Sequence, residues 1–183
     1  MGDPKKKHKR YTTPKRPYDQ EALEEELRLI GAYGLRNKRE LWSHRTEISR
    51  MRRMAREKLS MDPVERAEGE RAMTVKLRGL GLIGERAGLE DILTLRIEDL
   101  MERRLQTVVY RRGMAKSLFQ ARQLIAHGHI SMGGRKVRAP SHLVTLEDEA
   151  GLGYAASSPM AAAGHPMRRE LSVSEMVGGK ADG

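Results

Sequence analysis

The sequence predicts an α+β protein: a mostly helical N-terminal region followed by a small module of two helices packed on a short antiparallel sheet. Apolar residues recur at helical spacing through the first part of the chain, four glycines interrupt it at 79–88, and strand-like segments lie between 130 and 154. We therefore expect four regions: a basic disordered arm at 1–18, a helical domain at 19–90, the small module at 91–157 and a low-complexity tail at 158–183.

Positive charge is concentrated in two blocks. The 183 residues carry 35 Lys and Arg against 25 Asp and Glu, a formal net charge of +10. The net charge is +8 over residues 1–60 and +6 over 91–145, but −1 over 61–90 and −3 over 146–183. This pattern predicts two surfaces for a polyanion, which is either nucleic acid or an anionic membrane surface.

Several classes of protein are excluded by what the sequence lacks. There is no cysteine, which rules out disulfides and thiolate zinc sites. No apolar run approaches the length of a membrane span, and the lysine-rich N-terminal residues do not resemble a secretory signal. We expect a soluble protein of a reducing compartment.

The arm at 1–18 contains seven basic residues and three prolines without a periodic apolar pattern. This composition is typical of a segment that is disordered alone and becomes ordered on a polyanion. A nuclear-targeting signal or a merely solvated tail is the alternative.

The first helix is expected to begin after Asp19, a capping residue, and to end at Gly34. Its apolar residues are Leu23, Leu27 and Ile30.

A second, longer helix is expected from the capping box of Asn37 and Glu40 to Leu59. Between Ile48 and Arg56 it has four arginines and no acid, so that pairs of opposite charge are missing from this stretch. Such crowding favours contact with phosphate over an ordinary solvated face. The narrow apolar stripe consists of Leu41, Ile48, Met51, Ala55 and Leu59.

The third helix is expected to start at Asp62-Pro63-Val64-Glu65, where an Asp cap, a proline in the first turn and an acid follow one another. It runs to about Arg78. The four glycines after it suit a hinge between two modules.

The small module begins with one expected helix that carries Arg103 and Arg104 on its polar side. The second helix of the module opens at the capping box of Ser117 and Gln120 and ends at Gly128, a typical C′ residue. The apolar residues of the first helix are Ile97, Leu100, Met101, Leu105 and Val108, and those of the second are Leu118, Ala121, Leu124 and Ile125.

A tight hairpin follows the second helix of the module. The segments 130–132 and 135–137 flank Gly133-Gly134, a pair that readily adopts the positive φ angles of a two-residue turn. Strands at 143–146 and 152–154, joined by an acidic turn, are expected to complete the antiparallel sheet.

Arginine-rich helices with few aromatic residues favour recognition of RNA by phosphate and shape. The chain has only seven aromatic residues, and Phe119 is its one phenylalanine, so a sheet that stacks unpaired bases is disfavoured. A DNA-binding helix-turn-helix is disfavoured because Gly128 leads into a hairpin and not into a recognition helix.

Short runs of the sequence resemble a known family. The small RNA-binding module named after ribosomal protein four of the small subunit is similar at Arg96, Leu100, Arg104, Ser117, Ala121-Arg122, Leu124-Ile125, Gly128, Ile130, Gly134, Val137 and Pro140. The runs GLRNKRELW (34–42), RRLQT (103–107) and LIAHGHI (124–130) resemble the archaeal and eukaryotic branch of that ribosomal protein. The resemblance covers residues 1–155.

This resemblance implies a structural, non-enzymatic protein of the cytoplasmic small ribosomal subunit. It implies early assembly on a multi-helix junction in the 5′ part of the small-subunit rRNA, beside ribosomal protein five and near the mRNA entry side. Some bacterial relatives carry a cysteine zinc site near the N-terminus, which this chain cannot form. No cofactor, metal, membrane or small-molecule substrate is expected.

The candidate RNA-binding residues lie in the two basic blocks. They are Lys5, Lys6, Lys7, Lys9, Arg10, Arg36, Lys38, Arg45, Arg52, Arg53, Arg56, Arg103, Arg104, Arg111, Arg112, Lys116, Ser117, Arg122, His127, His129 and Lys136. The two histidines lack a third ligand, so strand-end packing or phosphate contact is favoured over metal binding. For Arg122, an ion pair with Glu102 is the alternative to RNA contact.

An RNA-modifying enzyme or a stand-alone RNA-binding regulator could use the same module. The sequence shows no P-loop, GxGxxG or HExxH motif, and its basic helices do not supply a catalytic domain. A role at a membrane surface is disfavoured because the apolar stripe of the basic helix at 37–59 is too narrow to insert.

Overall fold

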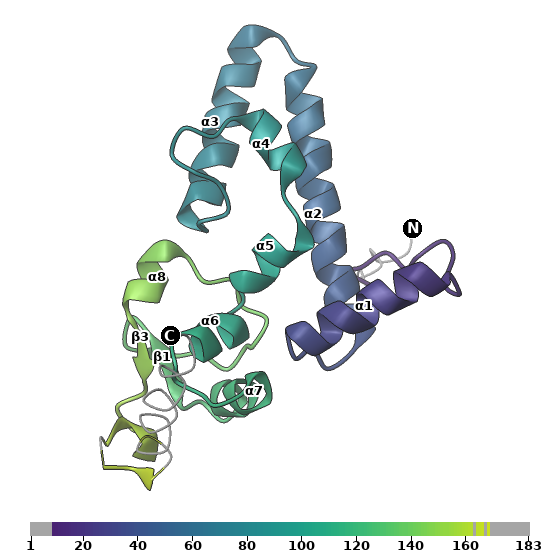
Figure 1. Ribbon diagram of the computed structural model, residues 1–183. Coiled ribbons are helices and arrows are strands. Elements are labelled where there is room, and N and C mark those ends of the chain that lie inside the picture. The colour runs from purple at the N-terminus through teal and green to yellow at the C-terminus, as the bar shows by residue number, and fades with distance from the viewer. Residues whose placement is uncertain (1–8, 163, 167, 169–183) are drawn as a thin grey trace, which may run out of the picture. The chain divides into compact units, whose positions relative to one another are not determined.

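The computed structural model describes residues 9–162, 164–166 and 168 (Figure 1). These residues form helices and one small sheet that belong to two compact units. The first unit comprises Met1–Thr74 and Arg86–Leu100, and the second comprises Val75–Glu85 and Met101–Gly183. The α+β class with a helical N-terminal region is confirmed.

Helix α1 (Gln20–Ala32) follows Asp19, whose side chain makes no capping hydrogen bond. It ends at Ala32, two residues before Gly34, which has a φ of 56°. Leu27, one of the apolar residues expected on this helix, is 60% exposed. Glu26 and Leu29 are buried on this helix, and the Glu26 carboxylate accepts a hydrogen bond of 2.8 Å from the indole of Trp42.

Helix α2 (Lys38–Leu59) begins at the predicted cap, where the Asn37 side chain accepts a hydrogen bond of 3.1 Å from the amide of Glu40. The buried residues of α2 pack against helix α4 (Leu89–Thr94). The sequence did not predict α4, because only six helical residues follow the glycine-rich stretch. Helix α3 (Pro63–Gly79) has the predicted start and ends one residue beyond the predicted end.

The single helix predicted around 97–108 is in fact two helices, α5 (Ile97–Glu102) and α6 (Leu105–Arg111). Between them Arg104 is extended and forms an isolated antiparallel bridge with Leu143. The amide of Leu105 donates to the carbonyl of His142 at 2.7 Å, and that of Val144 donates to the carbonyl of Arg103 at 2.8 Å. The chain around 143 therefore forms hydrogen bonds with the Arg103 carbonyl and the Leu105 amide, which a continuous helix would bond internally.

Helix α7 (Leu118–Ala126) has both predicted ends. The Ser117 hydroxyl accepts a hydrogen bond of 3.2 Å from the amide of Gln120. At the other end Gly128 has a φ of 75°, and the amides of Gly128 and His129 donate to the carbonyls of Ile125 and Leu124. These two bonds form a Schellman motif, which glycine permits because it adopts positive φ without strain.

The predicted hairpin is present. Strand β1 (Ile130–Met132) pairs with β2 (Arg135–Lys136), and Gly133 and Gly134 have φ angles of 51° and 78°. Strand β3 (Leu152–Tyr154) pairs with the other edge of β1, which gives the antiparallel order β2-β1-β3.

The strand predicted at 143–146 is wrong. Only Leu143 forms a bridge, and Thr145 caps helix α8 (Leu146–Ala150) by accepting a hydrogen bond of 3.0 Å from the amide of Asp148. The acidic residues expected in a turn form this helix because its N-terminus favours negative charge.

The core of the second unit extends beyond the expected end of the module at 157. Met160, in the short 3-10 helix Pro159–Ala161, is buried among residues of α6, α7 and β1. The core residues are Leu105, Val108, Val109, Ala115, Ala121, Leu124, Ile125, Ile130, Met132, Val144 and Met160.

Candidate RNA interface

In the second unit, exposed cations follow the turn of the hairpin. Arg135, Lys136 and Arg138 are exposed, and in the described part of the chain none of them has an ion-pair partner. The side chain of Arg138 lies beside Gly128, where an added Cβ would come within 3.0 Å of its Nε atom. The predicted contact residues include Lys136 but not Arg135, which lies in the predicted strand at 135–137, or Arg138, which follows it.

Arg122 lies at the edge of the buried face of α7. It is half-buried, and its Nη1 atom donates to the Gln106 side chain at 3.4 Å. Gln106 is itself fully buried and donates to the carbonyl of Leu118 at 3.0 Å. The hydrogen bond to Gln106 thus restrains the Arg122 guanidinium on α7. Glu102, the alternative partner, forms an ion pair of 2.9 Å with Arg111.

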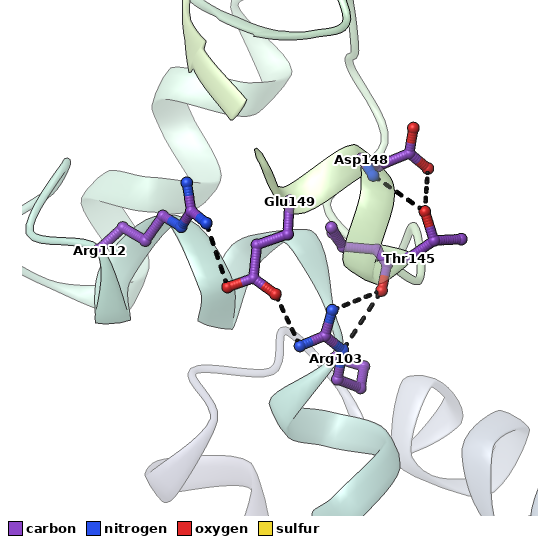
Figure 2. Close-up of polar contacts among 6 residues, drawn as sticks. Arg103, Arg112, Thr145, Asp148 and Glu149 are labelled. Carbon is purple, nitrogen blue, oxygen red and sulfur yellow. Dashed lines mark hydrogen bonds and ion pairs between the residues drawn. The ribbon is translucent and has the colours of Figure 1, made fainter. Parts of the chain in front are cut away.

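Two of the predicted contact residues are mostly or fully buried. Arg104 is 1% exposed, so its expected place on the polar side of a helix is wrong. The Arg103 side chain is 15% exposed, donates to the carbonyl of Val144 at 2.9 Å and 3.3 Å, and pairs with Glu149 at 2.8 Å (Figure 2). Both side chains turn inward because the chain around 143–149 packs against the break between α5 and α6.

Arg111 and Arg112 stay open to solvent at the C-terminal end of α6. Their side chains are 65% and 37% exposed. Arg111 pairs with Glu102, and Arg112 pairs with Glu149 at 3.4 Å. Lys116 and Ser117 follow at the exposed start of α7, where Ser117 serves as the cap.

The two histidines at the end of α7 differ in environment. His127 is exposed, whereas the Nδ1 atom of His129 lies 2.8 Å from the hydroxyl of Ser158. His129 therefore connects the hairpin to the segment after β3. Among the residues that the structure describes, no group of three or more His, Asp or Glu side chains could hold a metal ion.

The arginine-rich face of α2 is less uniform than its sequence indicates. Arg53 pairs with Glu57 at 3.3 Å, an acid one residue beyond the stretch that lacks acids. Arg52 turns inward and donates to the carbonyl of Leu95. Arg50 and Arg56 are exposed and, within the described residues, have no ion-pair partner.

The other predicted contact residues of the first unit that the structure describes are likewise either paired with an acid or exposed. Lys38 and Arg45 pair with the buried carboxylate of Glu26 at 3.2 Å and 3.7 Å, and Arg36 is exposed. Lys9 and Arg10 are exposed, whereas Lys5, Lys6 and Lys7 lie outside the described residues.

The described end of the arm lies against α2. The amide of Thr12 donates to the Thr46 hydroxyl at 3.0 Å, and the rings of Tyr11 and Trp42 lie 5.9 Å apart. A cleft of about 810 Å³ runs between the arm and the helix. Its lining includes three cations: Lys9, Arg10 and Arg50. Arg50 belongs to the run without acids but was not among the predicted contact residues.

One tyrosine of the second unit has a shifted pKa. The Tyr154 hydroxyl donates to the carbonyl of Met114 at 2.8 Å. Burial raises the pKa of Tyr154, and the positive charge of Arg168, 5.2 Å from the ring centre, partly opposes this rise.

No helix in the described part of the chain is long and apolar enough to cross a membrane.

Comparison with known proteins identifies the second unit and then the whole chain. The S4 domain family matches residues 103–149. The small ribosomal subunit protein uS4 of Ignicoccus hospitalis is 48% identical over 159 residues, 87% of this chain and 96% of the relative. The uS4 proteins of Hyperthermus butylicus (48% identical, 88% of this chain, 92% of the relative) and Metallosphaera sedula (45%, 87% and 89%) are also similar. Because these identities extend over most of both lengths, the chain belongs to the small ribosomal subunit protein uS4 family.

Proposed function

We propose that this protein is a structural constituent of the small ribosomal subunit and binds small-subunit rRNA directly. The observation that carries the proposal is the similarity to three archaeal proteins, each named small ribosomal subunit protein uS4. In this proposal the protein binds a multi-helix junction in the 5′ part of the rRNA and acts early in subunit assembly.

The surface chemistry supports contact through phosphate and shape. Exposed cations without ion pairs among the described residues occur in both units, including Arg56 and Arg50 on α2 and Arg135, Lys136 and Arg138 near the hairpin. Guanidinium groups bind phosphate oxygens through charge-assisted hydrogen bonds. Among the described residues, the strands carry one aromatic residue, Tyr154, whose hydroxyl donates a hydrogen bond to the Met114 carbonyl.

The same proposal names the partners and the place of action. The protein lies in the cytoplasm within the small subunit, beside ribosomal protein five and near the mRNA entry side. It acts by binding and has no catalytic activity of its own. Density for this chain in a reconstruction of the small subunit would test each of these contacts.

The binding step is tested by measuring affinity for small-subunit and large-subunit rRNA across a salt series. With on the order of ten phosphate contacts, the logarithm of the association constant should fall steeply with the logarithm of the salt concentration. The small-subunit rRNA should bind more tightly at moderate salt. A flat salt dependence, or equal affinity for both RNAs, would contradict the proposal.

A further inference from the structure

Two neighbouring arginines at the end of α6 are each held by a carboxylate from another helix of the second unit. The Nη2 atom of Arg111 lies 2.9 Å from Glu102, and the Nη2 atom of Arg112 lies 3.4 Å from Glu149. Both arginine side chains nevertheless remain exposed. They are therefore restrained in position while still accessible to a ligand.

Glu149 is itself fixed from the opposite side. Its second carboxylate oxygen lies 2.8 Å from Nη1 of Arg103, and Arg103 is anchored by two hydrogen bonds to the carbonyl of Val144 (Figure 2). One oxygen of Glu149 thus contacts a mostly buried arginine, and the other contacts an exposed one. This arrangement makes Glu149 a rigid support for Arg112.

Arg103 and Arg112, the two arginines that contact Glu149, differ in how many of their nitrogens have partners. Arg103 uses all three of its nitrogens, whereas Arg112 uses only Nη2. Within the described residues, the Nε and Nη1 atoms of Arg112 have no hydrogen-bond partner. A guanidinium group presents its N–H donors in a planar fork that matches a phosphate, so the remaining donors suit a phosphate oxygen.

We propose that Glu149 is a positioning residue for RNA, which holds the Arg112 guanidinium in place for a backbone phosphate. The proposal rests on the rRNA-binding function proposed above. A long side chain that is already ordered loses less conformational freedom when it binds. A negatively charged residue therefore strengthens the binding of a negatively charged ligand, which is the opposite of its direct electrostatic effect.

Helix α8 supplies a matched control. Glu147 is exposed on the same short helix and, among the described residues, has no ion-pair partner. Glu147→Gln and Glu149→Gln remove the same charge from the same element. Only the second of these substitutions removes the support of Arg112.

The experiment measures the affinity of the full chain for an archaeal small-subunit rRNA transcript at one fixed salt concentration. Glu149→Gln should weaken binding about threefold to tenfold through the lost ordering of Arg112. Glu147→Gln should leave binding unchanged or strengthen it by up to about twofold, because a repulsive charge is removed. Equal or tighter binding by the Glu149→Gln variant would show that the proposal is wrong.

A double-mutant cycle separates positioning from a general effect on the fold. If Glu149 acts through Arg112, Glu149→Gln should cause no further loss of affinity in an Arg112→Gln background. The same loss in both backgrounds would mean that Glu149 acts through Arg103 and the fold, which overturns the proposal. Failure of the function itself would appear differently, as equal affinity of the unmodified protein for small-subunit and large-subunit rRNA.

Discussion

Arginine has two physical roles in the second unit, and burial distinguishes them. Arg103 and Arg104 are mostly or fully buried, and the Arg103 side chain binds the Val144 carbonyl and the Glu149 carboxylate. Arg135 and Arg138 are exposed, and the described residues offer them no ion pair. A buried arginine is costly to leave unsatisfied, so its donors serve the fold, whereas an exposed arginine can bind an external phosphate.

Gly134 is one of two hairpin glycines whose positive φ angles the turn requires. Gly134 has a φ of 78°, which β-branched residues avoid. We expect Gly134→Val to lower the free energy of unfolding by about 1–3 kcal/mol through backbone strain. Gly153→Val is the control, because Gly153 has no positive φ and an added Cβ would meet nothing within 4 Å. Equal chemical-denaturation curves for the two variants would contradict this explanation.

Tyr154 should make the stability of the second unit depend on pH in the alkaline range. Burial raises its pKa above the ordinary value of 10.0, with Arg168 partly opposing the rise. The neutral phenol therefore stabilises the fold below the unfolded pKa, and this contribution is lost as the pH rises through the higher folded pKa. Between about pH 9 and pH 11, the melting temperature should fall less steeply with pH for Tyr154→Phe than for the unmodified protein. The same fall in both would exclude Tyr154 as the cause.

Helix α7 shows how local signals determine a whole element. Ser117 and Gly128 define its two ends through a side-chain cap and a Schellman motif. Its buried face leaves Arg122 at the edge, where the contact with Gln106 restrains the guanidinium. The helix thereby presents a restrained cation, whereas the exposed Lys9 side chain of the arm has no hydrogen bond or ion pair among the described residues.

This contrast predicts unequal effects of charge reversal. Arg122→Glu should weaken binding to small-subunit rRNA more than Lys9→Glu, because Arg122 is already ordered before binding. Each single loss is expected to be on the order of 1–3 kcal/mol or less, as for one charge-assisted contact. Affinity and thermal melting are measured together for both variants. If Arg122→Glu lowers the melting temperature and leaves affinity intact, Arg122 is structural.

At the scale of the whole molecule, the second unit depends on the chain beyond its sheet. The amide of Ala155 donates to the carbonyl of His129 at 2.8 Å, and Ser158 contacts the His129 ring. Met160 then completes the apolar core. A segment with a low-complexity composition therefore contributes directly to the stability of the module.

Met160→Ala should lower the free energy of unfolding by about 2–5 kcal/mol, because it leaves a cavity among buried apolar residues. Leu146→Ala is the control, since Leu146 is exposed and its loss should change stability by no more than about 0.5 kcal/mol. Denaturant titrations of the two variants compare these effects. Similar stabilities would mean that the segment after β3 adds little to the core.

The sequence by itself determined the features that depend on neighbouring residues. The start of α2 at Asn37, both ends of α7 and the turn at Gly133-Gly134 follow from caps and backbone preferences that act within a few residues. The family resemblance also depended on short runs, and the comparisons confirm it.

Only the tertiary structure decided the features that depend on distant segments. The break at Arg103-Arg104 arises because backbone groups some forty residues away bind there, and helical spacing of apolar residues on both sides hides the break in the sequence. The burial of Arg104 and of Met160 has the same origin, since contacts with remote elements set the exposure of a side chain. The sequence identified which cations the chain carries, and the fold decided which of them remain exposed on the surface.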